Sequence, residues 1–220
     1  MVRRFTYLVL AGALFSATAC DSTGPNDDAR MNVRLSADNS MQLSAVLLGD
    51  DAGAAPLSLS AVDSINLRIT AIEALRTDGD STEQRVTLSL RDSALTMINL
   101  LDLPSTDSSA WLLARGDIPA GTYNGIRLRF DVATATITLN DTVSVGQQTW
   151  LPGTYPLEVP SAQNNGIKVP MASIVIGADS TANVVLKFDG NTTVHTVATG
   201  SGVLKMSPVL RSNVRIENQD

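Results

Sequence analysis

The stretch GTYNGIRLRFDV, residues 121–132, carries the clearest structural pattern in the chain. From position 126 onward, apolar and charged side chains alternate in the order Ile126, Arg127, Leu128, Arg129, Phe130, Asp131 and Val132. Successive residues of a strand point to opposite faces of a sheet, so this order predicts a strand with one apolar and one charged face. Tyr123 falls out of phase between Gly121 and Gly125, which indicates a turn entering the strand, with the Tyr123 hydroxyl bonded to a neighbouring backbone group.

Similar alternations recur on both sides of this segment and are broken every 8 to 15 residues by turn residues. The predicted strands are residues 31–35, 41–47, 65–69, 86–90, 126–132, 135–139, 148–151, 157–159, 174–176, 184–188, 194–197 and 203–206. A helix of one or two turns is predicted over residues 107–115, with Trp111, Leu112 and Leu113 on its apolar side. Many short strands with frequent turns are typical of an all-β sandwich or barrel.

The composition narrows the possible functions. Of 220 residues, 44% are hydrophobic and 17% are charged, as expected for a folded chain. The 16 Lys and Arg residues against 22 Asp and Glu give a net charge of −6, and no basic run appears in the sequence. We therefore expect no nucleic-acid partner, because phosphate binding needs a Lys/Arg-rich face. One Cys and one His exclude a disulfide within the chain and a Cys/His zinc site.

The amino-terminal end has the organisation of an export signal. Arg3 and Arg4 precede an apolar run, which is followed by small residues and then by Cys20. The run is too short to span a bilayer as a helix. Residues 17–20, Ala-Thr-Ala-Cys, resemble the lipobox of bacterial lipoproteins, in which the thiol is diacylated and the chain is cut before the Cys. The small residues also suit ordinary signal cleavage after Ala19.

Three regions are expected from this organisation. Residues 1–19 are predicted to be a lipoprotein signal peptide, and residues 20–30 to be the lipidated Cys20 with a flexible tether. The segment 21–30 contains no apolar residue larger than Ala and cannot bury enough surface to fold. Residues 31–217 are predicted to form one β-sandwich domain. Two or three acyl chains would hold such a protein firmly on a membrane, where a single chain is marginal.

Several motifs of the predicted domain resemble, in order and spacing, those of the bacterial and archaeal domain-of-unknown-function family 4382. These motifs are residues 121–128, 159–161, 166–169, 184–189 with Val194, and 204–210, together with the earlier segments 65–69, 99–103 and 111–112. The resemblance covers most of residues 31–213. It implies an exported, often lipid-anchored β-sandwich, similar in outline to transthyretin-like or carboxypeptidase-regulatory-like modules, with no established activity and no catalytic residue. We therefore predict an all-β fold, a transthyretin-like or Ig-like β-sandwich with at most one short helix.

Three sets of residues suggest specific chemistry. Trp150 and Tyr155 flank a Pro-Gly turn and are candidates for an exposed platform that stacks sugar rings, although aromatic residues also fill cores. The segment holding Asp78 and Asp80 has the oxygen density that calcium prefers, but Asp-Gly between two strands is first of all a hairpin turn. His195 is the one available base for a hydrolase, and it lies in a predicted strand without a G-x-S-x-G turn elsewhere in the chain.

The sequence thus predicts a membrane-anchored lipoprotein of a bacterial cell envelope, facing the periplasm or the exterior, with a non-enzymatic binding or structural role. The expected partners are the membrane, through the lipid on Cys20, and a glycan or an envelope protein. No cofactor and no metal site is expected, and the membrane leaflet stays open. Carbohydrate binding through Trp150 and Tyr155 is the first alternative, and a hydrolase with His195 as the base is the second.

Overall fold

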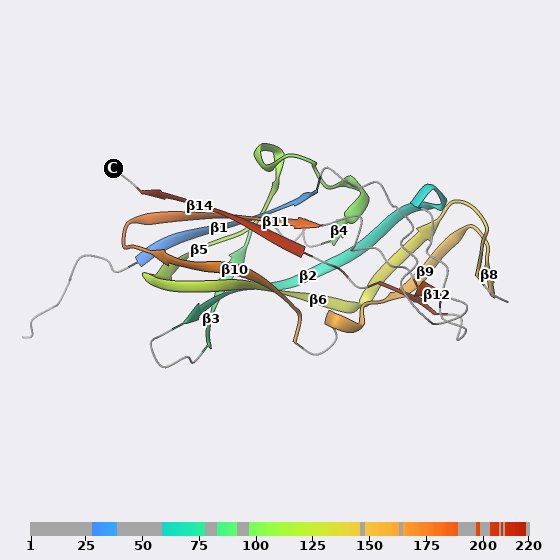
Figure 1. Cartoon of the computed structure of the whole chain (residues 1–220). Helices are drawn as coiled ribbons and strands as arrows, with labels where there is room; N and C mark the ends of the chain where they lie inside the picture. Colours follow the sequence, from blue (N-terminus) through green and yellow to red (C-terminus); the bar gives the residue numbers. More distant parts are fainter. Residues whose placement is uncertain are drawn as a thin grey trace, which may run out of the picture.

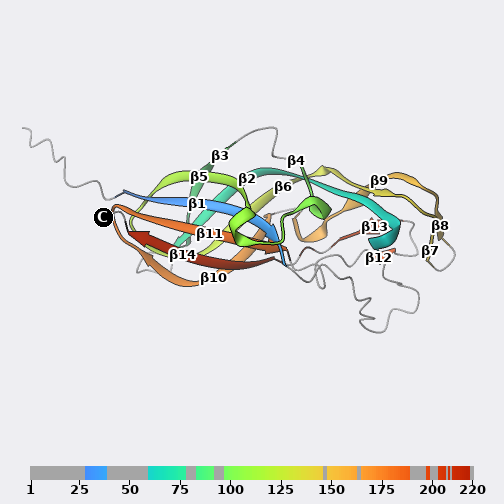
Figure 2. The ribbon, with the colours of Figure 1, turned by 90° about the horizontal axis from the view of Figure 1, so that it is seen from above.

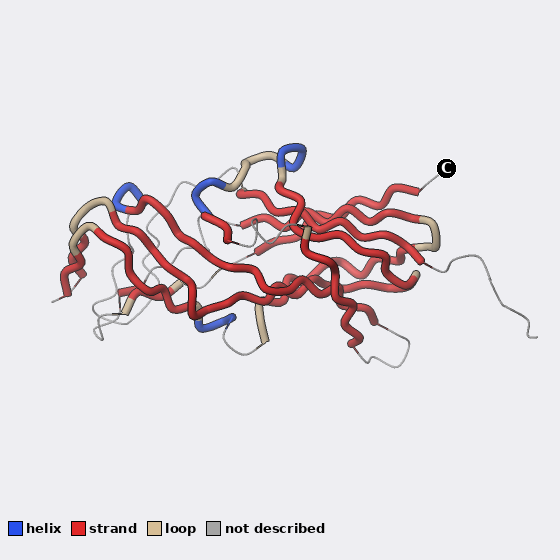
Figure 3. Tube along the Cα trace, turned by 180° about the vertical axis from the view of Figure 1, so that it is seen from behind, coloured by secondary structure: helices blue, strands red, loops and turns tan. Residues whose placement is uncertain are grey.

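The computed structural model of the chain describes residues 28–38, 59–77, 83–91, 97–145, 148–162, 165–188, 197–198, 203–206, 208 and 210–218. Within these residues every regular element is a strand or a three-residue 3-10 turn. Figure 3 shows the strands in red and the short helical turns in blue. The prediction of an all-β fold is confirmed. No helix in the described ranges has the length and apolarity that a bilayer crossing requires.

The elements follow one another along the chain in this order. The strands are β1 (Asp28–Ala37), β2 (Val62–Thr77), β3 (Glu83–Leu90), β4 (Met97–Asn99), β5 (Trp111–Pro119), β6 (Gly121–Leu139), β7 (Val143–Val145), β8 (Gln148–Trp150), β9 (Gly153–Glu158), β10 (Ile167–Ile176), β11 (Ser180–Phe188), β12 (Val197–Ala198), β13 (Leu204–Lys205) and β14 (Leu210–Asn218). The 3-10 turns are η1 (Leu59–Ala61), η3 (Leu100–Asp102), η4 (Asp107–Ser109) and η5 (Pro160–Ala162).

One large sheet makes up most of the fold, and it curls until β10, which branches from β6, meets the edge strand β14. The strand order is β12-β13-β9-β6-β2-β3-β5-β1-β11-β14, with β10 pairing with β6 and β4 with β2, while β7 and β8 form a separate hairpin. The curl lays β10, β6 and β2 opposite β14, β11 and β1 as two layers (Figure 1). The Ser212 hydroxyl donates to the Pro170 carbonyl at 2.7 Å and links β14 to β10. The two layers of a sandwich are therefore joined through β3 into one sheet.

Two long strands, β2 and β6, form the centre of this sheet. They pair antiparallel along almost their whole length, with several register shifts. The edge of β6 that does not pair with β2 pairs with β10 along its first half and with β9 at its last residues. The predicted strands 126–132 and 135–139 are thus one strand, bent at register shifts. Figure 2 shows that β7, β8, β9 and β12 gather at the end of the molecule opposite the carboxyl terminus.

The core lies between the two layers and is built from the apolar faces that the alternation predicts. Ile126 and Leu128 of β6 are fully buried, as are Ile72 of β2 and Leu35 of β1. Burying an aliphatic side chain of this size contributes about 1.5–3 kcal/mol of transfer free energy. The outward positions between these residues are the ones left for polar chemistry.

The predicted helix over residues 107–115 is wrong. Its first residues form the 3-10 turn η4, and the remainder belongs to β5, which pairs with β1 and β3. Val33 pairs with Ala114 and Arg34 with Leu112, so Leu113 is the extra residue of a β-bulge. The bulge puts two consecutive side chains, Leu113 and Ala114, into the core. It erases the two-residue period that identifies a strand in the sequence.

The boundaries of the other strands differ less from the predicted ones. β1 begins at Asp28, inside the segment expected to be a tether, because its backbone pairs with β5 and its first carbonyl accepts a hydrogen bond from the Asp179 amide at 3.1 Å. Pairing of the backbone does not require large side chains, so a polar sequence still forms the start of this strand. The predicted strand 41–47 and most of the predicted strand 194–197 lie outside the described residues.

Candidate functional site

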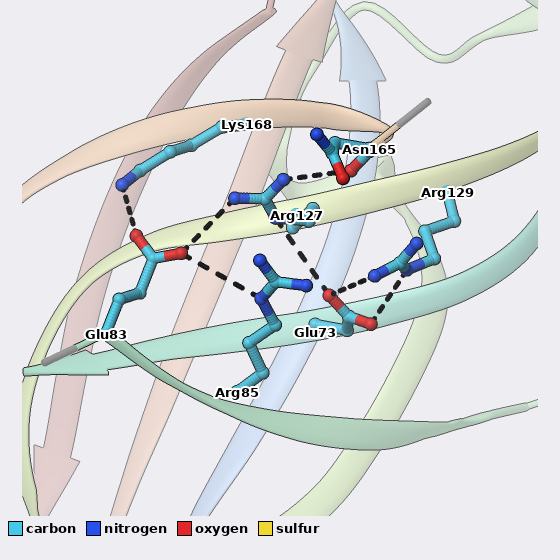
Figure 4. Close-up of polar contacts among 7 residues, drawn as sticks. All are labelled: Glu73, Glu83, Arg85, Arg127, Arg129, Asn165 and Lys168. Carbon is cyan, nitrogen blue, oxygen red and sulfur yellow. Dashed lines mark hydrogen bonds and ion pairs between the residues drawn. The ribbon is translucent and has the colours of Figure 1, made fainter. Parts of the chain in front are cut away.

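A cluster of charged side chains lies on the outward face of the sheet, across β10, β6, β2 and β3 (Figure 4). We call it the charged cluster, and its members are Glu73, Glu83, Arg85, Arg127, Arg129 and Lys168. The register sets Lys168 of β10 opposite Arg127 of β6, and Arg127 opposite Glu73 of β2. Side chains directly opposite each other on neighbouring strands are close enough to interact, so the pairing itself assembles the centre of the cluster.

Glu73 is the inner carboxylate of the cluster. It accepts hydrogen bonds from Arg129 at 2.8 Å, from Nε, and at 3.4 Å, from the terminal NH2 nitrogen. Arg127 Nε lies 4.0 Å from the second oxygen of Glu73, and the side chains of Glu73 and Arg127 are each 11% exposed. A charged side chain that is largely buried needs a partner of opposite charge, because an unpaired buried charge destabilises the fold. Glu73 therefore fixes both arginines of β6 against β2.

Glu83, the first residue of β3, is the outer carboxylate. Its Oε1 accepts a hydrogen bond from Arg127 at 3.2 Å and lies 4.0 Å from Arg85 Nε, while its Oε2 lies 2.5 Å from Lys168 Nζ. The hydrogen bond from Lys168 and the positive charges of Lys168 and Arg127 lower the pKa of Glu83, against the opposing effect of burial. Glu83 is therefore ionised at neutral pH and already engaged by cations, which makes it a poor proton acceptor or donor.

Two glycines allow the backbone to hold this arrangement. A Cβ on Gly125 would lie 3.0 Å from the Val169 carbonyl oxygen and 3.2 Å from Leu75 Cδ1, so its absence makes room for Leu75 beneath the charged groups. Gly166 has a φ of 70°, and a Cβ there would lie 2.3 Å from the Leu128 carbonyl oxygen. No L side chain fits that space, and the left-handed backbone itself favours glycine.

Gly166 also positions a backbone acceptor for the cluster. The preceding residue, Asn165, accepts a hydrogen bond through its carbonyl from the NH1 nitrogen of Arg127 at 2.9 Å. This bond holds the Arg127 guanidinium between Glu73 and Glu83. The turn before β10 thus orients the central cation of the cluster, and the sequence motif around residues 166–169 acquires a structural reason.

The two aromatic residues proposed as a sugar platform differ in burial. Trp150, at the end of β8, is 7% exposed and belongs to the core. Tyr155 of β9 is half-buried, and its hydroxyl donates to the Leu151 carbonyl at 2.7 Å. Trp150 therefore packs in the core, which was the alternative to a sugar platform. The Tyr155 hydroxyl already donates its hydrogen bond to the backbone of the neighbouring turn.

Tyr155 repeats a device found at the start of β6. The Tyr123 hydroxyl donates to the Pro119 carbonyl at 2.7 Å, which confirms the predicted bond to a neighbouring backbone group. Both tyrosines end a Gly-Thr-Tyr sequence, both bonds reach four residues back, and the glycines at the two strand starts, Gly121 and Gly153, share a φ of 154°. The two motifs turn the chain into β6 and β9 by the same local means.

The remaining candidates cannot be placed. Cys20, Asp78, Asp80 and His195 lie outside the described residues. Among the residues that the structure does describe, no group of three His, Cys, Asp or Glu side chains is arranged to hold a metal ion.

The fold and the cluster together define a class of protein: an all-β domain with a curled two-layer sheet and a charged outer face built by cross-strand pairing. The chain belongs to the family described as Domain of unknown function (DUF4382), which matches residues 45–208. The family resemblance of the sequence motifs is thereby confirmed. The chain has no significant match among curated proteins or among solved structures. All six members of the charged cluster lie within the matched range.

The charged cluster was not predicted from the sequence. Its cations come from three strands and its carboxylates from two, so no stretch of the chain is rich in charge. The sequence feature that could have predicted it is the pair Arg127 and Arg129, which lie on the polar face of a strand whose other face is apolar. Two outward arginines with one residue between them indicate that acidic partners lie on a neighbouring strand.

Proposed function

We propose that the protein is a lipid-anchored component of a bacterial cell envelope, whose β-domain has a non-enzymatic binding or structural role. Acyl chains on Cys20 would hold the mature chain on a membrane. The resemblance of residues 17–20 to a lipobox supports the anchor. The expected side of the membrane is the periplasm or the exterior, since the signal directs export.

The observation that carries this proposal is the lipobox resemblance of residues 17–20, and the short chain segment between Cys20 and the first strand gives the anchored protein an orientation. Seven residues lie between Cys20 and Asp28 at the start of β1, and the eight Cα–Cα steps from Cys20 to Asp28 span about 29 Å at most when fully extended. The end of the sheet that contains Asp28 is therefore the membrane-proximal end. The turn at Asp179 and the end of β14 lie at the same end, as shown by the bond from Asp179 to Asp28 and the pairing of Asn218 with Ser180.

The opposite end of the molecule would point away from the membrane. β6 has 19 residues, which corresponds to a strand about 60 Å long before bending. The hairpin of β7 and β8 lies at the end opposite the carboxyl terminus in Figure 2. A sheet of this length, attached by one short tether, is suited to presenting its far end away from a bilayer.

The chemistry of the charged cluster supports a role without catalysis. Both carboxylates are held by arginine or lysine side chains, and the pKa of Glu83 is lowered rather than raised toward neutrality. General acid or base catalysis at neutral pH favours a group whose pKa lies near the working pH. The paired carboxylates therefore fit a binding or structural surface.

Mass spectrometry of the processed chain, produced in a bacterium with lipoprotein processing, tests the anchor. We expect an acylated Cys20 as the first residue and recovery in the membrane fraction. A Cys20→Ser variant should lack the acyl mass, whereas a Ser22→Ala variant should retain it. An unmodified amino terminus in the parent protein, or an acyl mass on Cys20→Ser equal to that of the parent, would refute the proposal.

A further inference from the structure

The charged cluster carries more positive than negative charge. Among the described side chains it joins four cations, Arg85, Arg127, Arg129 and Lys168, to two carboxylates. The whole chain has the opposite balance, with a net charge of −6. A local surplus of cations on an acidic protein is a distinct electrostatic feature, because such a surface attracts anions that the rest of the molecule repels.

The donors of the cluster are not all used. Arg127 Nε is buried and donates to no acceptor among the described residues, with Glu73 4.0 Å away. Arg85 makes one ion pair there, at 4.0 Å to Glu83, which is longer than a hydrogen bond. Lys168 uses one ammonium donor, on Glu83, and the side chains of Arg85 and Lys168 remain 44% and 43% exposed.

The exposed cations, Arg85 and Lys168, converge on one place. Lys168 contacts Oε2 of Glu83, while Arg85 and Arg127 both approach Oε1, so the two exposed cations lie at different oxygens of one carboxylate. The close-up in Figure 4 shows the three cations around this carboxylate. The three cations already bind one anion through both of its oxygens, namely the carboxylate of Glu83.

We propose that the charged cluster is a binding site for a phosphate-type oxoanion, held at the outer rim by Arg85 and Lys168. Guanidinium and ammonium groups that flank one carboxylate also suit the tetrahedrally arranged oxygens of a phosphate ester or pyrophosphate. Glu83 competes for the same cations and therefore limits the affinity. The site does not depend on the anchoring of Cys20, so it stands or falls separately from the proposed function.

Calorimetric titration of the full processed chain, in a neutral detergent at low ionic strength, tests this site. Pyrophosphate is the probe for a free anion, and glycerol phosphate is the probe for a lipid headgroup or a polymer with the same chemistry. Saturable binding of either probe supports the proposal, and the tighter of the two identifies the source. No heat with either probe at millimolar concentration overturns it.

Substitutions assign the binding to the cluster. Arg85→Gln and Lys168→Gln should each weaken the affinity by up to about fivefold, which is the equivalent of about 1 kcal/mol for an exposed charge pair. Arg85→Lys should retain most of the affinity. Glu83→Gln should strengthen binding by a similar factor, a result that a purely structural role of Glu83 does not produce.

The matched control is Arg215→Gln. Arg215 lies on β14 in the other layer, its side chain is 82% exposed and its ion pair is with Glu217, so the substitution removes the same charge from outside the charged cluster. Its affinity should stay within about twofold of the parent. If Arg215→Gln weakens binding as much as Arg85→Gln, or if Glu83→Gln weakens it in a variant with unchanged circular dichroism, the anion does not bind at this cluster.

Discussion

Replacing Glu73 by Gln tests whether the charged cluster holds the sheet together. The substitution keeps the shape of the side chain and removes its charge. Glu73 accepts two hydrogen bonds from Arg129, at 2.8 and 3.4 Å, and faces Arg127 at 4.0 Å. After the substitution, the buried Arg127 guanidinium retains Glu83 as its one carboxylate partner among the described residues.

The magnitude follows from burial. Breaking a buried ion pair by removing one partner costs about 3–5 kcal/mol, and a hydrogen bond to a charged group contributes about 1.5–3 kcal/mol. The Arg129 side chain is 34% exposed and can be partly hydrated in the variant, and Arg127 keeps its ion pair with Glu83, so the expected loss lies at or below the lower end of the range of about 3–5 kcal/mol. We expect a loss of about 2–3 kcal/mol in the free energy of unfolding. In a domain of this size that loss lowers Tm by about 4–12 °C.

Urea unfolding of the parent and the variant, followed by circular dichroism, measures this change. Asp117→Asn is the matched control, because it makes the same carboxylate-to-amide change at an ion pair of comparable length. Arg30 and Asp117 lie 3.3 Å apart, but their side chains are 55% and 68% exposed. An exposed pair contributes about 0.2–1 kcal/mol. Equal losses for Glu73→Gln and Asp117→Asn would show that burial does not strengthen the cluster, and the reasoning would fail.

Three further predictions concern stability. Gly166→Ala should lower the free energy of unfolding by about 2 kcal/mol or more, because the new Cβ meets backbone at 2.3 Å in a left-handed conformation; thermal unfolding equal to the parent would contradict this. Tyr123→Phe and Tyr155→Phe each remove one hydrogen bond from a tyrosine hydroxyl to a backbone carbonyl. Tyr123→Phe should lower the free energy of unfolding by about 1–2 kcal/mol, more than Tyr155→Phe, because Tyr123 is fully buried. Urea midpoints in the reverse order would argue against the assigned bonds. Hydrogen bonds from Lys168 and Lys187 lower the pKa of Glu83 and of Asp107, respectively, below their ordinary values of 4.5 and 3.8. Both carboxylates therefore stabilise the folded state at a pH above these ordinary pKa values, and this stabilisation is lost as the pH falls through the lowered pKa values. An acid titration of stability should therefore be less steep in Glu83→Gln than in the parent, and parallel curves would exclude the contribution of Glu83.

The strands with regular alternation were predictable because a buried face imposes its period on the sequence. Residues 126–132 of β6 show this most clearly, and Ile126 and Leu128 are in the core as expected. The start of β5 was not predictable, because the bulge at Leu113 interrupts the period and four apolar residues in a row suit a helix equally well. The hydroxyl bond of Tyr123 was foreseen from its neighbouring glycines, and the identical bond of Tyr155 was hidden by the interpretation of its ring as a ligand platform.

The sequence by itself determined the all-β class and the family, since both rest on the local period of side chains and on short motifs. It also marked Gly166 and Lys168 as part of a motif, without a reason for either. The tertiary structure alone decided that Glu73, Arg127 and Lys168 stand in one row across three strands, and that Trp150 faces the core. Strand pairing joins residues that are tens of positions apart in the chain, and no local pattern records which strand becomes the neighbour of which.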